Sequence, residues 1–156
     1  MNFRLFTKIS FLALLLMFVL PGCVVNTFTK GVPNPERTQG LKAPAPQGEH
    51  ELIALEGPGT FLSASITKQG GGNDLTFVIL DIDGRNVVNL SIAAAKNVGL
   101  TQNNPYILDL VKSSGDIKTL TIGLPSPLYF ERELKLRVNV QEAGVVQIVA
   151  NVIHGK

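Results

Sequence analysis

Apolar and polar residues alternate most regularly near the C-terminal end of the chain. Between 133 and 140, apolar side chains occupy every second position. A period of two predicts a half-buried β-strand, with one face in a core and the other in water. The apolar residues are Leu134, Leu136, Val138 and Val140, and the polar ones are Glu133, Lys135, Arg137 and Asn139. Residues 146–153 continue the pattern after a predicted turn at 141–144, so we expect a C-terminal hairpin. Its second strand would place Val146, Ile148, Ala150 and Val152 on one face.

A second hairpin is predicted between residues 75 and 92. The segment 75–81 is rich in β-branched and aromatic residues, and Asp83-Gly84 is a dipeptide favoured in type I′ turns. The returning segment 86–92 alternates again. We expect Val88, Leu90 and Ile92 on its inner face and Asn89 and Ser91 on its outer face.

The remaining patterns indicate further short strands. Segment 61–66 predicts a strand with Leu62, Ala64 and Ile66 inward, and 106–111 and 118–122 predict two more. Pro125 and Pro127 should break the chain after them. Only 93–96 suggests a helical turn. With seven or eight short strands and no long helix, we expect an all-β fold, a single antiparallel β-sandwich rather than a small barrel, because polar outer faces alternate with apolar inner ones.

The segment before this domain has a different composition. Residues 24–50 contain four prolines among polar residues and show no period of 2 or 3.6. Such segments are typical of extended spacers. We therefore expect residues 23–50 to form a flexible, Pro-rich tether reaching up to roughly 80 Å, and residues 51–156 to form the sandwich domain.

Composition supports a globular domain and excludes some partners. Hydrophobic residues make up 45% of the 156 residues and charged ones 17%. The formal net charge is +2, but Arg4 and Lys8 lie in the first ten residues, and without them twelve basic side chains balance twelve acidic ones. No basic field remains to attract nucleic acid.

The N-terminal end has the three parts of an export signal. Residues 1–10 carry two positive charges and no acid, residues 11–20 are all apolar, and Pro21-Gly22 follows. Ten apolar residues are about half of what a membrane-spanning helix needs. The pattern therefore predicts a secretory signal peptide over residues 1–22.

Leu20-Pro21-Gly22-Cys23 resembles the lipobox of bacterial lipoproteins, with Leu at −3, Gly at −1 and Cys at +1. Pro21 departs from the residues usual at −2. The resemblance covers residues 1–23 alone. It implies that Cys23, the sole cysteine, receives a diacylglyceryl group, that residues 1–22 are removed, and that the new amine is acylated. Two or three acyl chains anchor a protein stably to a membrane. Val24 at +2, where Asp would favour retention in the inner membrane, implies export to the outer membrane in a Gram-negative host.

Two motifs suggest ion or phosphate binding, and neither is complete. Asp81-Ile82-Asp83-Gly84 begins like a calcium loop, but Ile92 stands where an EF-hand has its bidentate Glu. A different calcium site that includes Asp74 remains an alternative to a plain hairpin turn. The run at 70–72 lacks the Lys-Ser/Thr of a phosphate loop.

Catalytic groups are scarce. His50 lies in the predicted tether and His154 close to the C-terminal end, so we expect both on the surface and no metal site. No Gly-x-Ser-x-Gly is present, and the Cys is assigned to the lipid. Glu131 and Glu133 should lie on the solvent face of a strand. We therefore expect no enzyme activity and no cofactor.

The most polar irregular segment, 96–105, is the best place for binding residues. Loops held by a rigid scaffold often carry binding groups. The residues that could hydrogen-bond a glycan or a peptide backbone are Asn97, Gln102, Asn103, Asn104 and Tyr106. A plain crossover loop is the alternative.

These observations favour a lipid-anchored envelope protein that acts as a non-catalytic binding or structural module. Its partners would be the membrane, through the lipid, and an envelope protein or glycan. Two alternatives stay open at the level of sequence: a small envelope hydrolase, and a subunit of a surface assembly.

Overall fold

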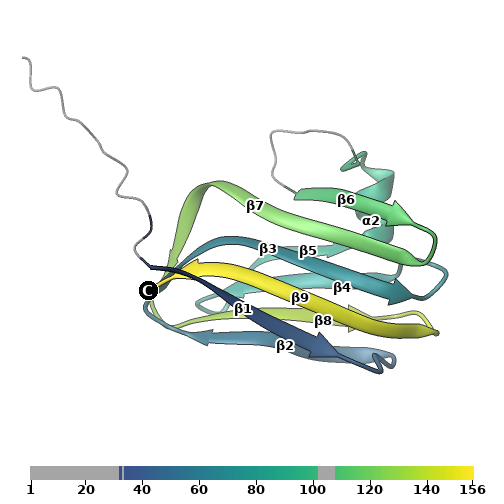
Figure 1. The fold of residues 1–156 in the computed structure, drawn as a ribbon, viewed down its shortest axis with the longest axis horizontal. Helices are drawn as coiled ribbons and strands as arrows, with labels where there is room; N and C mark the ends of the chain where they lie inside the picture. Colours follow the sequence, from purple (N-terminus) through teal and green to yellow (C-terminus); the bar gives the residue numbers. More distant parts are fainter. Residues whose placement is uncertain (1–31, 33, 102–107) are drawn as a thin grey trace, which may run out of the picture. The chain divides into compact units, whose positions relative to one another are not determined.

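The chain forms a sandwich of two antiparallel sheets, seen in a computed structural model that describes residues 32, 34–101 and 108–156 (Figure 1). The five-stranded sheet has the order β1-β9-β3-β7-β6 and the four-stranded sheet the order β2-β8-β4-β5. The strands of the first sheet are β1 (Pro35–Lys42), β9 (Val145–Gly155), β3 (Gly59–Gly70), β7 (Ile117–Phe130) and β6 (Leu108–Ser114). Those of the second are β2 (Gly48–Glu56), β8 (Glu133–Val140), β4 (Thr76–Ile82) and β5 (Arg85–Ser91). The predicted all-β sandwich is confirmed, with nine strands in the described residues.

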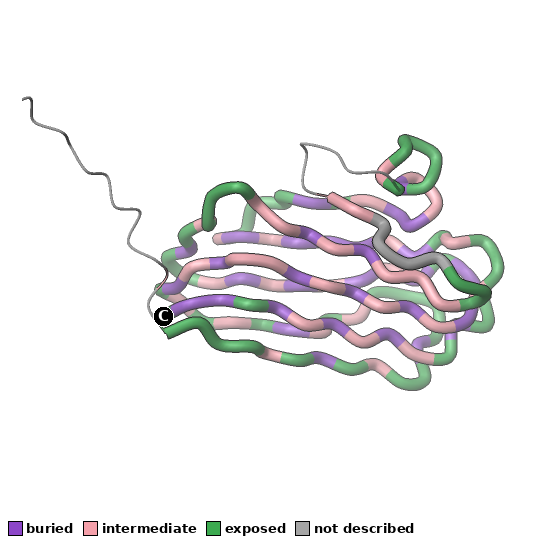
Figure 2. Tube along the Cα trace, turned by 45° about the horizontal axis from the view of Figure 1, so that its top comes forward, coloured by how far each residue is buried: buried purple, intermediate pink, exposed green. Residues whose placement is uncertain are grey.

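Alternate side chains of both sheets meet in the core, as Figure 2 shows by the repeating burial colours along the strands. All four apolar residues of β8 are buried, as its period of two predicts. They pack against Val78 and Leu80 of β4 and against residues of the facing sheet such as Ile148 and Val152 of β9. Burial of each such side chain stabilises the fold by about 1.5–3 kcal/mol.

The predicted C-terminal hairpin is wrong, because β8 and β9 belong to different sheets. The chain crosses from one layer to the other at residues 141–144, with Gly144 at φ +80°. Both strands alternate because both face the same core, and alternation cannot distinguish a hairpin from a crossing between layers. A register shift where β3 meets the start of β9 also turns Val145 inward and leaves Val146 exposed, against expectation.

The β4–β5 hairpin agrees with the sequence except at Ser91, which was expected on the outer face and is buried at the end of β5. Asp83 and Gly84 have φ of +53° and +78°, the signs that a type I′ turn requires at both central positions. Val88 is buried and Leu90 packs against the core, as expected. Ile92 is also buried, but it begins the one short helix, α2 (Ile92–Asn97), which Ser91 caps by accepting a hydrogen bond from the Ala94 N–H. That helix replaces the single predicted turn at 93–96.

The predicted tether is wrong from residue 35 onward, because β1 and the first residues of β2 belong to the sandwich. β1 pairs along its length with β9, and Ala45 in the following connection is buried. β1 is an edge strand with most side chains exposed, so its sequence shows no apolar alternation. Pro35 occupies the first position of the strand, where the missing N–H is tolerated.

One bulge explains two further corrections. The pairing of β3 with β7 shifts between Phe61 and Ser63, so that Phe61 is fully buried and Leu62 is not, whereas Ala64 and Ile66 point inward as expected. Opposite Leu62, residues 124–127 of β7 have no partners in the ladder. Pro125 and Pro127 therefore lie in a bulged segment within one long strand and do not end it. The strand predicted over 118–122 lies inside β7. The strand predicted over 106–111 corresponds to β6, which begins at Leu108, and residues 106–107 fall outside the described part of the chain.

Candidate functional site

Most of the residues predicted to bind a partner lie where the structure gives no description. Of the segment 96–105, Asn97 is exposed at the end of α2, while Gln102, Asn103, Asn104 and Tyr106 fall outside the described residues. Cys23 falls outside them as well. Over the described ranges, no helix has the length and apolar character to cross a membrane.

The two histidines occupy different environments. His50 is half-buried on β2 and its Nε2 donates a hydrogen bond to the Pro46 carbonyl at 2.7 Å. His154 was expected at the surface, but it is only 2% exposed, and the end of β9 that carries it lies between β1 and β3 in the sheet. Its Nε2 lies 2.9 Å from Thr38 Oγ1, and its Nδ1 has no hydrogen-bond partner among the described residues.

A calcium site that combines Asp74 with Asp81 and Asp83 is contradicted by their positions. Asp74 precedes β4 and Asp83 follows it, so the strand's seven residues hold them about 23 Å apart. Within the described ranges, no group of three His, Cys, Asp or Glu side chains is placed to hold a metal ion.

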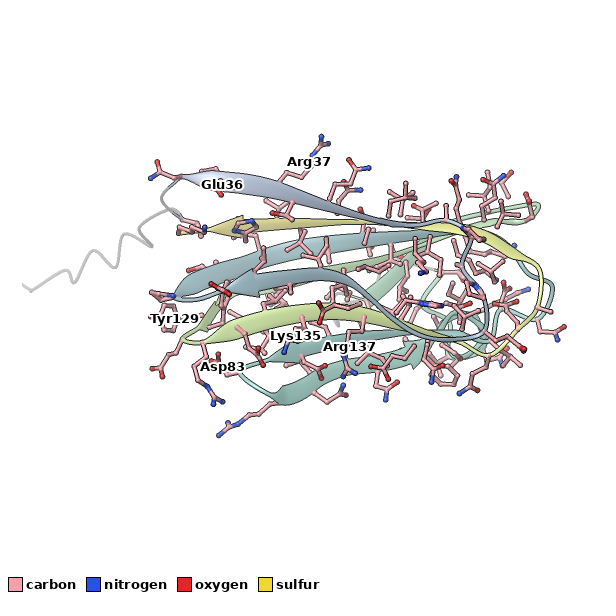
Figure 3. The ribbon with its side chains drawn as sticks, turned by 90° about the horizontal axis from the view of Figure 1, so that it is seen from below. Glu36, Arg37, Asp83, Tyr129, Lys135 and Arg137 are labelled. Atoms are coloured by element: carbon pink, nitrogen blue, oxygen red, sulfur yellow. The ribbon has the colours of Figure 1, made fainter. Side chains whose placement is uncertain are left out.

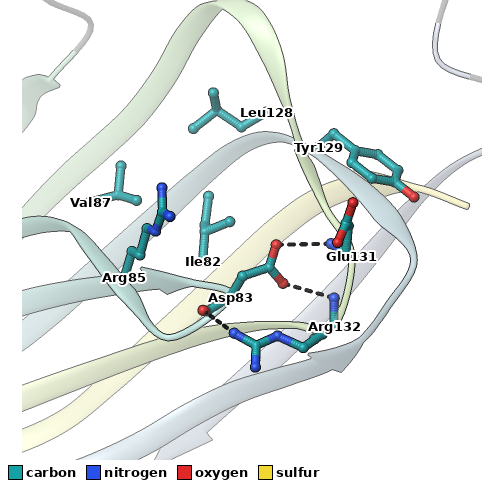
Figure 4. Close-up of a pocket in the computed structure, with 8 residues that line it drawn as sticks. All are labelled: Ile82, Asp83, Arg85, Val87, Leu128, Tyr129, Glu131 and Arg132. Carbon is teal, nitrogen blue, oxygen red and sulfur yellow. Dashed lines mark hydrogen bonds between the residues drawn. The ribbon is translucent and has the colours of Figure 1, made fainter.

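The end of the sandwich at the β4–β5 turn carries an open pocket of about 550 Å³, which we call the hairpin pocket (Figure 4). Its walls come from the β4–β5 hairpin and from the end of β7 with the turn into β8. The lining residues are Ile82, Asp83, Arg85, Val87, Leu128, Tyr129, Glu131 and Arg132.

Asp83 joins the two walls of the hairpin pocket. Its carboxylate accepts hydrogen bonds from the backbone N–H groups of Glu131, Arg132 and Glu133 at 2.8–3.1 Å, and the Arg132 guanidinium donates to the Asp83 carbonyl. The N–H groups of Glu131 and Arg132 are the main reason that the pKa of Asp83 is lowered. A carboxylate held ionised in this way is suited to fastening two turns and not to proton transfer near neutral pH.

The groups left for a ligand in the hairpin pocket are Arg85, Tyr129, Val87 and the exposed side chain of Glu131. The Tyr129 side chain is 61% exposed and Val87 is 44% exposed. The guanidinium of Arg85 makes no ion pair within the described residues. This set offers a cation, a carboxylate, a phenol and an apolar wall in a wide opening, which suits contact with a polar partner surface better than enclosure of a small substrate.

Beside the hairpin pocket, the outer surface of the four-stranded sheet carries a charged face formed by Glu49, Asp81, Glu133, Lys135 and Arg137 (Figure 3). Arg137 bridges Glu49 and Asp81, and its hydrogen bond to Asp81 is the first cause of its raised pKa. Lys135 pairs with Glu133 at 2.7 Å. Glu131 is exposed, and the Glu133 side chain is 40% exposed on this face, as the sequence indicates.

A buried charged group at the opposite end of β4 was not anticipated. The Lys68 cluster consists of Lys68, Asp74, Thr76 and Glu142. Lys68 occupies the next inward-facing position of β3 after Ala64 and Ile66. A lysine at a position where the alternation predicts an apolar residue is the sequence signal that could have revealed this cluster. Burial raises the pKa of Glu142, but hydrogen bonds from Lys68 and Thr76 and the charge of Lys68 outweigh it, and the pKa is lowered.

Comparison with known proteins identifies no relative by sequence: no protein-family model and no curated protein matches the chain. Among solved structures, a crystal structure of FLHE aligns with a TM-score of 0.40 and 11% identity, covering 79% of this chain and 99% of that one. A structure of infectious bursal disease virus, Gx strain, aligns with a TM-score of 0.25 and 9% identity, covering 79% of this chain and 41% of that one. Likeness at this level is too slight to indicate a shared function.

Proposed function

We propose that the chain is a lipid-anchored cell-envelope protein whose sandwich acts as a binding or structural module without catalysis of its own. The observation that carries the proposal is the position of Cys23. The sole cysteine follows a charged leader, ten apolar residues and Gly22, where lipid attachment requires a thiol. Val24 at the next position favours the outer membrane of a Gram-negative host.

Mass spectrometry of the protein extracted from its native membrane tests this proposal. The expected N-terminal residue is a diacylglyceryl-modified, N-acylated Cys23. An N-terminal Met1, or a free thiol on a cleaved chain, would contradict lipid anchoring.

The hairpin pocket supports the non-catalytic part of the proposal. Of its two carboxylates, Asp83 is committed to backbone N–H groups and Glu131 is exposed to water, and no histidine lines the pocket. Its exposed cation and phenol suit recognition of carboxylate or hydroxyl groups on an envelope protein or a glycan.

The contact is tested by crosslinking in cells, with Arg85→Ala combined with Tyr129→Ala. We expect fewer crosslinked products and an unchanged melting temperature. Asp116→Ala, in the exposed turn between β6 and β7 at the other end of β7, is the control and should retain them. If the wild type, the double variant and the control variant gave equal amounts of crosslinked product, the hairpin pocket would be excluded as the contact surface.

A further inference from the structure

Lys68 places a primary amine where water does not reach. Its side chain is 0% exposed, and its Nζ lies 3.0 Å from Asp74 Oδ1 and 2.7 Å from Glu142 Oε1. The Glu142 side chain is 1% exposed and that of Asp74 is 16% exposed. Lysine is almost never fully buried, and two ions taken from water lose hydration that their attraction only partly replaces. Condensation of Lys68 with Asp74 would remove the charge of the buried amine, while Glu142 would keep its charge and its hydrogen bonds from Thr76 and two backbone N–H groups.

The loop between β3 and β4 is shaped to bring Asp74 back onto Lys68. Gly70, Gly71 and Asp74 all have positive φ, at +82°, +77° and +54°. A Cβ on Gly71 would lie 2.5 Å from Glu142 Oε2, so only glycine leaves room for that carboxylate. The backbone of this loop is therefore strained at Asp74, and at Gly71 it passes so close to the Glu142 carboxylate that a side chain would not fit.

Glu142 is fixed in a single orientation beside the amine. Its Oε1 accepts hydrogen bonds from Lys68 Nζ and from Thr76 Oγ1 at 2.8 Å. Its Oε2 accepts from the backbone N–H groups of Asn73 and Asp74, both at 3.0 Å. A carboxylate held against both reacting residues can accept a proton from one and return it to the other.

We propose that Lys68 and Asp74 condense to a side-chain amide, an internal isopeptide bond, with Glu142 as the proton carrier. Lys68 first transfers a proton to Asp74 Oδ1, which leaves a neutral amine and a neutral carboxylic acid. The amine lone pair attacks Asp74 Cγ and forms the C–N bond, and Glu142 takes the proton that the nitrogen releases. The C–OH bond then breaks, and the leaving oxygen receives the proton from Glu142 and departs as water.

Geometry and environment both favour this step. Groups held in contact react with effective molarities of about 10⁵–10⁸ M, so the fold supplies the encounter. The product replaces a buried ammonium and a partly exposed carboxylate with a neutral amide, whose N–H can still donate to Glu142 Oε1. Glu142 ends ionised, as it began, and keeps the donors from Thr76, Asn73 and Asp74.

Trypsin digestion of the denatured full-length protein tests the bond. Unmodified chains are cut after Lys42, Lys68 and Arg85, which gives the separate peptides 43–68 and 69–85. With the bond formed, Lys68 is not cut, and a single peptide 43–85 appears that is lighter by one water. Complete cleavage after Lys68, or a 43–85 peptide of full mass, would overturn the proposal and leave the cluster as an ion pair.

Three variants separate the chemistry from the fold. Asp74→Ala, at the most exposed member of the cluster, removes the acceptor carbon and should restore cleavage after Lys68. Asp74→Asn should still form the amide, with loss of ammonia in place of water. Glu142→Gln keeps the shape but removes the proton carrier, so the crosslinked fraction should fall at least tenfold. Equal crosslinking in Glu142→Gln would overturn the assigned role of Glu142.

Discussion

At Asp83, one short side chain joins two turns that are 48–50 residues apart in the sequence. The local part of its role could be predicted, since Asp-Gly between two apolar segments indicates a type I′ turn. Its bonds to the N–H groups of residues 131–133 could not, because they depend on the turn by which the chain passes from β7 in one sheet to β8 in the other. The Lys68 cluster was missed for the same reason, as Glu142 lies 74 residues from Lys68.

The lowered pKa of Asp83 predicts an effect of pH on stability. A carboxyl group whose folded pKa is below its unfolded value, about 3.9, stabilises the fold above that value, and the stabilisation disappears as the pH falls through the folded pKa. Asp83→Asn should therefore lower the melting temperature at pH 7 and flatten its fall as the pH drops below about 4. Asp116→Asn, in the exposed turn between β6 and β7, is the control and should keep the wild-type slope.

Neighbouring positions on β8 should respond very differently to truncation. Leu136 is fully buried, so Leu136→Ala loses apolar burial and leaves a cavity, at a cost of about 2–5 kcal/mol in the free energy of unfolding. Lys135 lies on the charged face, and Lys135→Ala should leave that free energy nearly unchanged. Urea denaturation measures both. Similar losses at the two positions would contradict the register of β8.

At the scale of elements, the sequence predicts strands better than it predicts their partners. The β4–β5 hairpin was correct because a two-residue turn allows only one partner strand. The pairing of β8 with β9 was wrong, and in fact β8 lies between β2 and β4, strands remote from it in sequence. β1 was missed because an edge strand with mostly exposed residues has no apolar period. Alternation reports which face is buried, whereas pairing depends on contacts between distant segments.

The position of β1 changes the expected boundary of the folding unit. A fragment of residues 51–156 lacks β1 and the start of β2, so β9 would become an edge strand with unpaired backbone groups. A fragment of residues 32–156 keeps the whole compact unit. By circular dichroism, we expect a cooperative melt for 32–156 and a lower melting temperature or aggregation for 51–156. Identical melts would show that β1 contributes nothing to stability.

At the scale of the molecule, the shorter tether brings the domain closer to the proposed lipid. Twelve Cα–Cα steps separate Cys23 from Pro35, so β1 begins at most about 43 Å from the anchor point. A tether ending at residue 50 would allow a distance of roughly 80 Å. β1 starts at the end of the sandwich that also carries the hairpin pocket, since Pro35 pairs with Gly155 and Gly59 pairs with Phe130.

Cys23→Ser should separate membrane attachment from folding. The substitution removes the thiol that would carry the lipid, while residues 32–156 form a compact unit with its own core. We expect the variant to leave the membrane fraction after cell lysis and a high-salt wash, because no acyl chain holds it. Its melting temperature, measured in detergent beside the wild type, should be unchanged, since the core formed by the described residues begins at Ala45. A variant that stayed in the membrane fraction would indicate that the uncleaved leader or a partner provides the anchor. A lower melting temperature would mean that the lipidated segment contributes to the stability of the sandwich.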